Sequence, residues 1–179
     1  MPNLLRHQFG FRRALRASLH VGLVLLASSC MYSLVQGGLP GHIRTIAVLP
    51  FENSTVEAIL STEVQQQLQD RIPRDLGVRL AAPGVADALI RGRIVAIEEP
   101  PPTARAAEGG TGIQVLEREI RIVAETEIYD VRQNRPLYKA NSLTAIGRFR
   151  PDTEASSVAR ARAITELARL IVQGAQSQW

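Results

Sequence analysis

The sequence predicts an α+β fold: a four-stranded, largely antiparallel sheet with two amphipathic helices packed on one face, in the order β-α-β-β-β-α. Runs in which apolar and polar residues alternate predict the strands. Two longer segments repeat an apolar residue about every four positions, which predicts helices. Each helix has one apolar stripe to bury, so we expect both helices on the same face of the sheet.

The N-terminal residues 1–29 predict a secretory signal peptide. This segment has four arginines, no acidic residue, and an apolar run at residues 19–27. The run is shorter than the roughly 20 apolar residues that span a bilayer. Small residues at 27–29 suit cleavage by a signal peptidase. The alternative is a membrane anchor that is never cleaved.

Cys30 is the one cysteine of the chain and directly follows "LASS". It has no intrachain disulfide partner, and an exported free thiol is open to oxidation. The stretch "ASSC" resembles a bacterial lipobox, so we expect lipidation at Cys30 and stable anchoring by several acyl chains. Residues 30–42 would form a lipidated tether, and residues 43–179 a single domain. The residue after the cysteine is Met31 and not aspartate. In this the chain resembles proteobacterial lipoproteins that are sent to the outer membrane.

The first half of the domain predicts a strand followed by a helix. Residues 43–49 are rich in β-branched side chains, and Pro50 ends the strand. The segment 54–57, "STVE", fits a capping box that begins the helix, and Pro73 closes it. The expected apolar stripe is Val56, Ile59, Leu60, Val64, Leu68 and Ile72.

The second half predicts three more strands and the last helix. Alternation marks strands at residues 88–97, 120–129 and 137–149, with a possible brief edge strand at 78–80. Residues 100–112 predict a long loop. Asp152 or Thr153 would cap the final helix. The stripe expected for that helix is Val158, Ala161, Ile164, Leu167, Ala168, Ile171 and Ala175.

Composition argues against several functional classes. The net charge is +4, from 21 basic and 17 acidic residues, but four of the arginines lie in the predicted signal peptide. The remainder is neutral and 4% of residues are aromatic, so we expect no nucleic-acid partner. His42 is the one histidine beyond the signal peptide, so we expect no metal site, no cofactor and no catalytic constellation.

The sheet face turned away from the helices is predicted to be chemically mixed. Alternation places on it Leu89, Arg91, Arg93, Val95, Ile97, Val123 and Tyr129. A half-apolar face of this kind suggests a surface that meets a partner. The alternative is a solvated sheet with cross-strand Arg–Glu pairs. The sequence leaves both open.

The stretch "CMYSLVQGGLPGHIRTIAVLPFENST" resembles the opening of the LPS-assembly lipoprotein family, LptE. A later match is "ADALIRGRI" at residues 86–94. The residues that carry the resemblance are Cys30, Tyr32, Leu39, Pro40, Ile43, Ile46, Ala47, Val48, Phe51, Glu52 and Asn53. It implies a non-enzymatic lipoprotein at the periplasmic face of the outer membrane. There it would plug and help assemble a large β-barrel, LptD, and assist lipopolysaccharide insertion into the outer leaflet.

The same resemblance implies that arginines recognise the phosphates of lipid A, because the planar guanidinium binds phosphate bidentately. The candidate lipopolysaccharide-binding residues are Arg91, Arg93, Arg118 and Arg121. The alternative is that they form exposed ion pairs with Glu125 and Glu127 on the neighbouring strand. The loop at 100–112 is a further candidate for partner contact.

The stretch "IAVLPFENST" is also similar to curli-secretion-channel (CsgG-like) and synthase-activator (LpoB-like) lipoproteins. That similarity would imply an export-channel subunit or a periplasmic activator. A pore former needs long extra hairpins, and an activator usually has a longer tether than the ten or so residues expected here, which reach at most ~35 Å. This alternative therefore ranks second.

Overall fold

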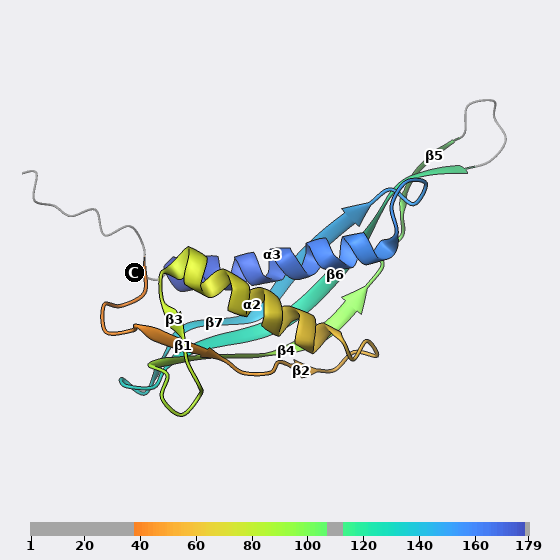
Figure 1. Cartoon of the computed structure of the whole chain (residues 1–179). Helices are drawn as coiled ribbons and strands as arrows, with labels where there is room; N and C mark the ends of the chain where they lie inside the picture. The colour runs from red at the N-terminus through yellow and green to blue at the C-terminus, as the bar shows by residue number, and fades with distance from the viewer. Residues whose placement is uncertain (1–37, 107–112, 178–179) are drawn as a thin grey trace, which may run out of the picture. The chain divides into compact units, whose positions relative to one another are not determined.

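A computed structural model describes residues 38–106 and 113–177 of the chain (Figure 1), which belong to one compact unit, Gly37–Trp179. The fold is α+β with two helices and a seven-stranded mixed sheet. In chain order the elements are β1 (Thr45–Val48), β2 (Glu52–Asn53), α2 (Leu60–Leu76), β3 (Arg79–Leu80), β4 (Ala88–Glu98), β5 (Thr103–Ala106), β6 (Ile113–Asp130), β7 (Arg135–Phe149) and α3 (Ser156–Gln176).

The sheet is mixed, which corrects part of the four-stranded prediction. Its long strands β4, β6 and β7 pair antiparallel, as expected. The short strands β1 and β2 instead run parallel to β4, and β3 runs parallel to β1. Helix α2 connects the first strands to the later ones as a crossover, and a crossover of this kind allows parallel pairing. The brief edge strand expected at 78–80 is confirmed by β3.

A β-bulge at Val95 changes which face the end of β4 presents. The register with β6 shifts between Ile94 and Ala96, so alternation inverts beyond that point. Ile97 therefore pairs with Ile122 and packs against the core. The prediction that Ile97 lies on the uncovered face was wrong for this reason.

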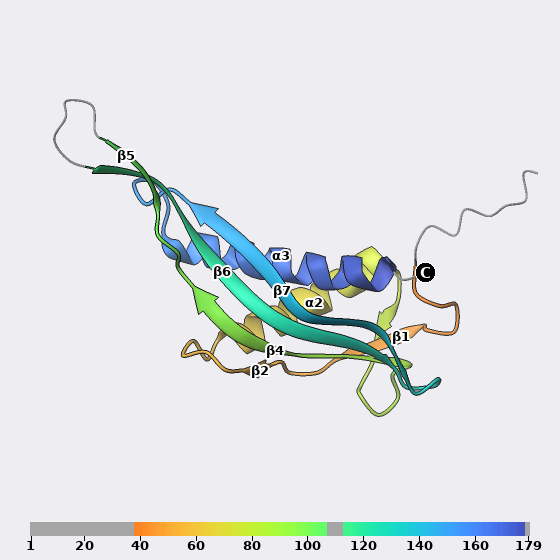
Figure 2. The same cartoon turned by 180° about the vertical axis from the view of Figure 1, so that it is seen from behind.

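Part of the segment predicted as a loop at 100–112 is a strand. Residues Thr103–Ala106 form β5 and pair antiparallel with the start of β6. The two strands extend past the helix-covered part of the sheet (Figure 2). Residues 107–112 lie outside the described part of the chain, so the role expected for this loop remains a prediction.

Helix α2 begins later and ends later than predicted. Its buried stripe is Leu60, Val64, Leu68 and Ile72, as expected, but Val56 is 98% exposed. The capping-box prediction was wrong, because the Asn53 side chain organises that turn: its Oδ1 accepts from Thr55 and its Nδ2 donates to the backbone carbonyl of Glu57. Pro73 lies inside the helix, which ends at Gly77 with a φ of 66°.

Helix α3 packs beside α2 on one face of the sheet, as expected (Figures 1 and 2). It begins after Ala155, and neither Asp152 nor Thr153 caps it. Val158 is 38% exposed and Ala161 is also exposed, while Ala159 and Ala163 are buried. The first turns of α3 are therefore rotated about the helix axis relative to the predicted stripe. Gly147 of β7 explains this rotation, since a Cβ there would lie 1.8 Å from the Ala159 backbone oxygen. The close approach turns the small residues of the first helical turns toward the sheet.

Candidate functional site

The face of the sheet that the helices leave uncovered holds an open depression of about 340 Å³. Its lining includes Arg91 and Arg93 of β4, Glu125 and Glu127 of β6, and Lys139 of β7. The cross-strand register places Arg91 opposite Glu127 and Arg93 opposite Glu125. Charges of both signs therefore alternate across this face, and we call the depression the sheet-face site.

Arg91 and Arg93 are both engaged in ion pairs at the sheet-face site. Nη2 of Arg91 lies 2.6 Å from Oε2 of Glu127, and its guanidinium carbon lies 5.2 Å from the centre of the Tyr129 ring. Nε of Arg93 lies 2.8 Å from Oε2 of Glu52. The predicted partner Glu127 is confirmed for Arg91, whereas Arg93 pairs with β2 instead. Both arginine side chains remain about half exposed.

The other two candidate arginines lie elsewhere. Arg121 forms an ion pair with Glu119 at 2.7 Å. It lies four residues along β6 from Glu125, the residue opposite Arg93, which is a distance of roughly 13 Å along the strand. Arg118 pairs with Glu99 at 2.7 Å. By strand alternation Arg118 shares the face of the buried Ile120, while Arg121 lies on the opposite face. The four candidates are therefore not one cluster, and the sheet-face site contains two of them.

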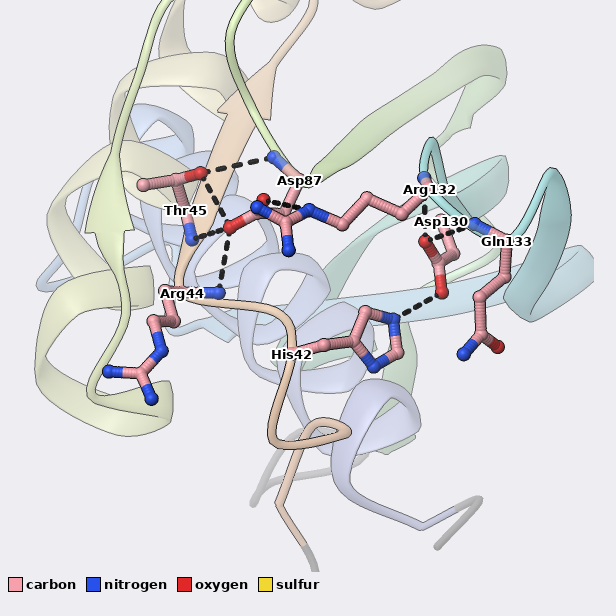
Figure 3. Close-up of polar contacts among 7 residues, drawn as sticks. All are labelled: His42, Arg44, Thr45, Asp87, Asp130, Arg132 and Gln133. Atoms are coloured by element: carbon pink, nitrogen blue, oxygen red, sulfur yellow. Dashed lines mark hydrogen bonds and ion pairs between the residues drawn. The ribbon is translucent and has the colours of Figure 1, made fainter.

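A second polar group, which the sequence did not predict, lies where the chain enters the domain (Figure 3). We call it the entry cluster; its members are His42, Thr45, Asp87, Asp130 and Arg132. Nε2 of His42 donates to Oδ2 of Asp130 at 2.6 Å, and the Asp130 side chain is fully buried. Oδ1 of Asp130 accepts the backbone N–H groups of Arg132 and Gln133, at 2.9 and 3.0 Å. This carboxylate therefore ties the entering chain to the β6–β7 turn.

Asp87 fastens the same entering segment from the other side. Its Oδ2 accepts the backbone N–H groups of Arg44 and Thr45, each at 3.0 Å, and the Thr45 hydroxyl at 2.9 Å. Its Oδ1 lies 2.8 Å from Nε of Arg132 (Figure 3). Leu39 also packs against the core and Ile43 is buried, so the chain is fixed to the domain before β1 begins.

Hydrogen bonding keeps both aspartates ionised. For Asp87, the N–H of Arg44 and the hydroxyl of Thr45 lower the pKa despite partial desolvation. Burial alone would raise the pKa of Asp130, but the N–H of Gln133 and the imidazole of His42 outweigh it and leave the pKa below its ordinary value. The entry cluster thus holds two buried, satisfied carboxylates.

The His42–Asp130 pair has the geometry of two members of a catalytic triad. Within the described residues, the hydrogen bond shown for the imidazole is the one to Asp130, and no hydroxyl donates to it. The nearby Thr45 hydroxyl donates to Asp87 instead. Across residues 38–106 and 113–177, no group of three or more His, Cys, Asp and Glu side chains is placed to hold a metal ion. The bonds of the pair join the entering chain to the β6–β7 turn.

No helix of the described ranges is long and apolar enough to cross a membrane. Cys30, the predicted lipidation site, lies outside those ranges.

Comparisons with known proteins give one family and several similar folds. The LptE family, described as lipopolysaccharide-assembly, matches residues 43–176. No curated protein sequence matches the chain. Among solved structures, a minor lipoprotein from Acinetobacter baumannii is 18% identical with a TM-score of 0.43, covering 73% of this chain and 91% of that one. The hypothetical protein CT253 from Chlamydia trachomatis is 11% identical with a TM-score of 0.49, covering 73% and 96%. A PelC dodecamer from Paraburkholderia phytofirmans is 14% identical with a TM-score of 0.45, covering 73% and 90%.

Proposed function

The chain belongs to the LptE lipopolysaccharide-assembly family, and from that premise we propose that it is an outer-membrane lipoprotein that helps deliver lipopolysaccharide to the outer leaflet. The single observation that carries this proposal is the family match at residues 43–176, which spans the sheet and both helices. We propose a non-enzymatic role: the domain plugs a large β-barrel partner of the LptD type and assists its assembly.

The proposed arrangement has three parts. Residues 1–29 act as a signal peptide, Cys30 carries the lipid, and residues 43–179 form the working domain. A lipid tether raises the effective concentration of the domain near a partner in the same membrane, so affinity for the barrel does not have to come from contacts alone. The rigid helix-backed sheet supports this role, because a packed scaffold holds its surface in one shape.

Lipopolysaccharide contact is proposed at the sheet-face site. Arg91 and Arg93 lie two residues apart on β4, and both guanidinium groups are half exposed. Their present carboxylate partners form surface ion pairs, which contribute about 0–1 kcal/mol each. A lipid A phosphate offers a stronger bidentate partner and would replace Glu127 or Glu52. Arg121 remains a secondary candidate on the same face, and Arg118 would need a separate contact on the opposite face.

Depletion of the chain in its parent organism tests this function. We expect less lipopolysaccharide at the cell surface, measured with an outer-leaflet probe, together with loss of the folded barrel partner. Restoring the wild-type chain should reverse both defects. Normal surface lipopolysaccharide and normal barrel levels after complete depletion would contradict the proposal.

A further inference from the structure

Exposed apolar and basic residues gather where the chain enters the domain. We call this surface the entry face and define it by Arg44, Arg79, Leu80, Val85, Val131 and Arg132. Val85 is 75% exposed, Val131 45% and Leu80 42%. Arg44 and Arg79 are exposed as well. The entry face is distinct from the sheet-face site, because its residues lie before β1, on β3, in the loop before β4 and in the β6–β7 turn.

Backbone hydrogen bonds join these segments into one surface. The N–H of Val131 donates to the Asp87 carbonyl at 2.9 Å, which ties the β6–β7 turn to the loop before β4. The N–H of Arg79 donates to the Arg44 carbonyl at 3.0 Å, which ties β3 to the entering chain. The entry cluster lies beneath and fixes the same segments (Figure 3). The backbone segments that carry the exposed side chains are therefore held in fixed positions relative to one another.

The charge of the entry face is positive and largely uncompensated. Arg44 and Arg79 have no side-chain partner within the described residues, and the Arg44 guanidinium points away from the entry cluster (Figure 3). The aspartates beneath are buried and fully engaged. This contrasts with the sheet-face site, where each candidate arginine has a carboxylate partner. The unpaired arginines favour an anionic partner here.

We propose that the entry face binds the membrane leaflet that holds the lipid anchor, with Val85 and Val131 entering the interface and Arg44 and Arg79 contacting anionic phospholipid headgroups. This rests on the proposed lipidation of Cys30. Only eight residue steps separate Cys30 from Gly38, so this end of the domain stays within about 29 Å of the bilayer. Apolar side chains flanked by arginines suit the boundary between headgroups and acyl chains. The acyl chains on Cys30 and the contact of the entry face with the bilayer would together fix the orientation of the domain relative to the membrane.

A site-specific fluorophore tests the proposal on the full lipidated protein. Acylation protects Cys30, so Val85→Cys or Val131→Cys introduces one reactive thiol. Val56→Cys, before α2, is the matched control because that valine is 98% exposed yet lies outside the entry face. The labelled proteins are placed in phosphatidylethanolamine vesicles with or without phosphatidylglycerol, and quenching by a nitroxide-labelled lipid is measured. We expect strong quenching at 85 and 131 in the anionic vesicles, and little at 56.

Charge variants test the arginines. In the Val85→Cys background, Arg44→Gln with Arg79→Gln should lower the membrane-contact equilibrium about 25-fold, at about fivefold for each arginine near an anionic surface. Arg169→Gln on α3, which is paired with Glu166, serves as the control and should leave quenching unchanged. High salt should imitate the double variant because it screens exposed charges.

The outcomes separate the inference from its premise. Unquenched probes at 85 and 131 on an acylated protein would overturn the inference and leave the lipoprotein function standing. Equal quenching at 56, 85 and 131 would overturn it too, since no particular face would then meet the membrane. Labelling of Cys30 itself by the dye would show that the anchor is missing, and the premise would fail with the inference.

Discussion

The imidazole of His42 lies 2.6 Å from the carboxylate of Asp130, 88 positions later in the chain, and that carboxylate is fully buried. The bond closes a clamp in which Asp130 holds the β6–β7 turn and the entering segment together. Asp130 is thus one of two buried carboxylates, the other being Asp87, that fasten the entering chain to the domain.

Replacement of that carboxylate should destabilise the domain. We expect Asp130→Asn to lower the free energy of unfolding by about 2 kcal/mol: the amide oxygen could still accept the two backbone N–H groups, but the amide NH2 would replace the oxygen that accepts from the imidazole. Asp152→Asn is the control, since that aspartate is exposed. Denaturant titration of both variants measures the difference, and equal stabilities would contradict the clamp.

Acid should weaken the domain through the same cluster. Asp87 and Asp130 have lowered pKa values when folded, so their contribution is fully present above the pKa of the unfolded chain, about 4, and is lost as pH falls through the folded values. The free energy of unfolding should therefore decline below about pH 4. Asp87→Asn should flatten this decline in a titration of stability against pH. An unchanged slope would show that Asp87 contributes nothing to it.

The close contact between β7 and α3 depends on a glycine, Gly147, which has no side chain. Gly147→Ala would place a Cβ 1.8 Å from the Ala159 backbone oxygen, so we expect a loss of about 2 kcal/mol or more from forced repacking. Gly84→Ala is the matched control, because a Cβ added there would meet nothing within 4 Å, and its stability should stay within about 0.5 kcal/mol of wild type. Thermal unfolding distinguishes the two. A tolerated Gly147→Ala would show that the helix can move away.

The arginines of the sheet-face site should affect ligand binding more than stability. Arg91→Gln with Arg93→Gln removes two surface ion pairs, so unfolding should change by no more than about 1 kcal/mol for each pair. Affinity for purified lipopolysaccharide should fall at least about tenfold if both guanidinium groups contact phosphate. Binding to immobilised lipopolysaccharide measures this, with Arg162→Gln as the control, since it is paired with Glu154 outside this site. Wild-type affinity in the double variant would remove these residues from the proposal.

The proposed lipid anchor depends on the sulfur atom of Cys30. Cys30→Ser should abolish acylation, because a serine hydroxyl does not replace the thiol that carries the proposed lipid, and the share of the chain that the acyl chains hold in the membrane fraction should fall. Labelling with radioactive palmitate followed by fractionation measures both effects. A Cys30→Ser chain that stays in the membrane without label would mean that something other than lipid holds it there.

Much of the fold followed from periodicity. The strand predicted at residues 120–129 is part of β6, and its alternate residues Ile120, Ile122, Ala124, Thr126 and Ile128 are all buried. The stripe from Leu60 to Ile72 was equally clear. Strand β3 was expected as a brief edge strand, whereas the two residues of β2 are too few for alternation to mark. The parallel pairing of both strands was not predicted, because it depends on the crossover through α2. The bulge at Val95 was not predicted either, because residues 88–97 alternate without a break and give no local reason for a register shift.

The sites were less predictable than the fold. Arg91 and Arg93 were placed together correctly by their spacing of two. The spacing of three already separates Arg118 and Arg121 onto opposite faces of a strand, but the sequence does not show how far along β6 they lie from the sheet-face site. The entry cluster joins residues 42 or more positions apart, so no local pattern reveals it. We predicted that His42 belongs to a tether, because glycines and a proline precede it. In the structure a hydrogen bond to Asp130, 88 positions later, fixes it to the domain.

The most direct test of the central claim is purification of the wild-type chain from the membranes of its parent organism in mild detergent, followed by identification of whatever accompanies it. A one-to-one complex with a large β-barrel protein is the predicted result. Isolation as a ring of identical subunits, or with a peptidoglycan synthase and no barrel, would contradict the account.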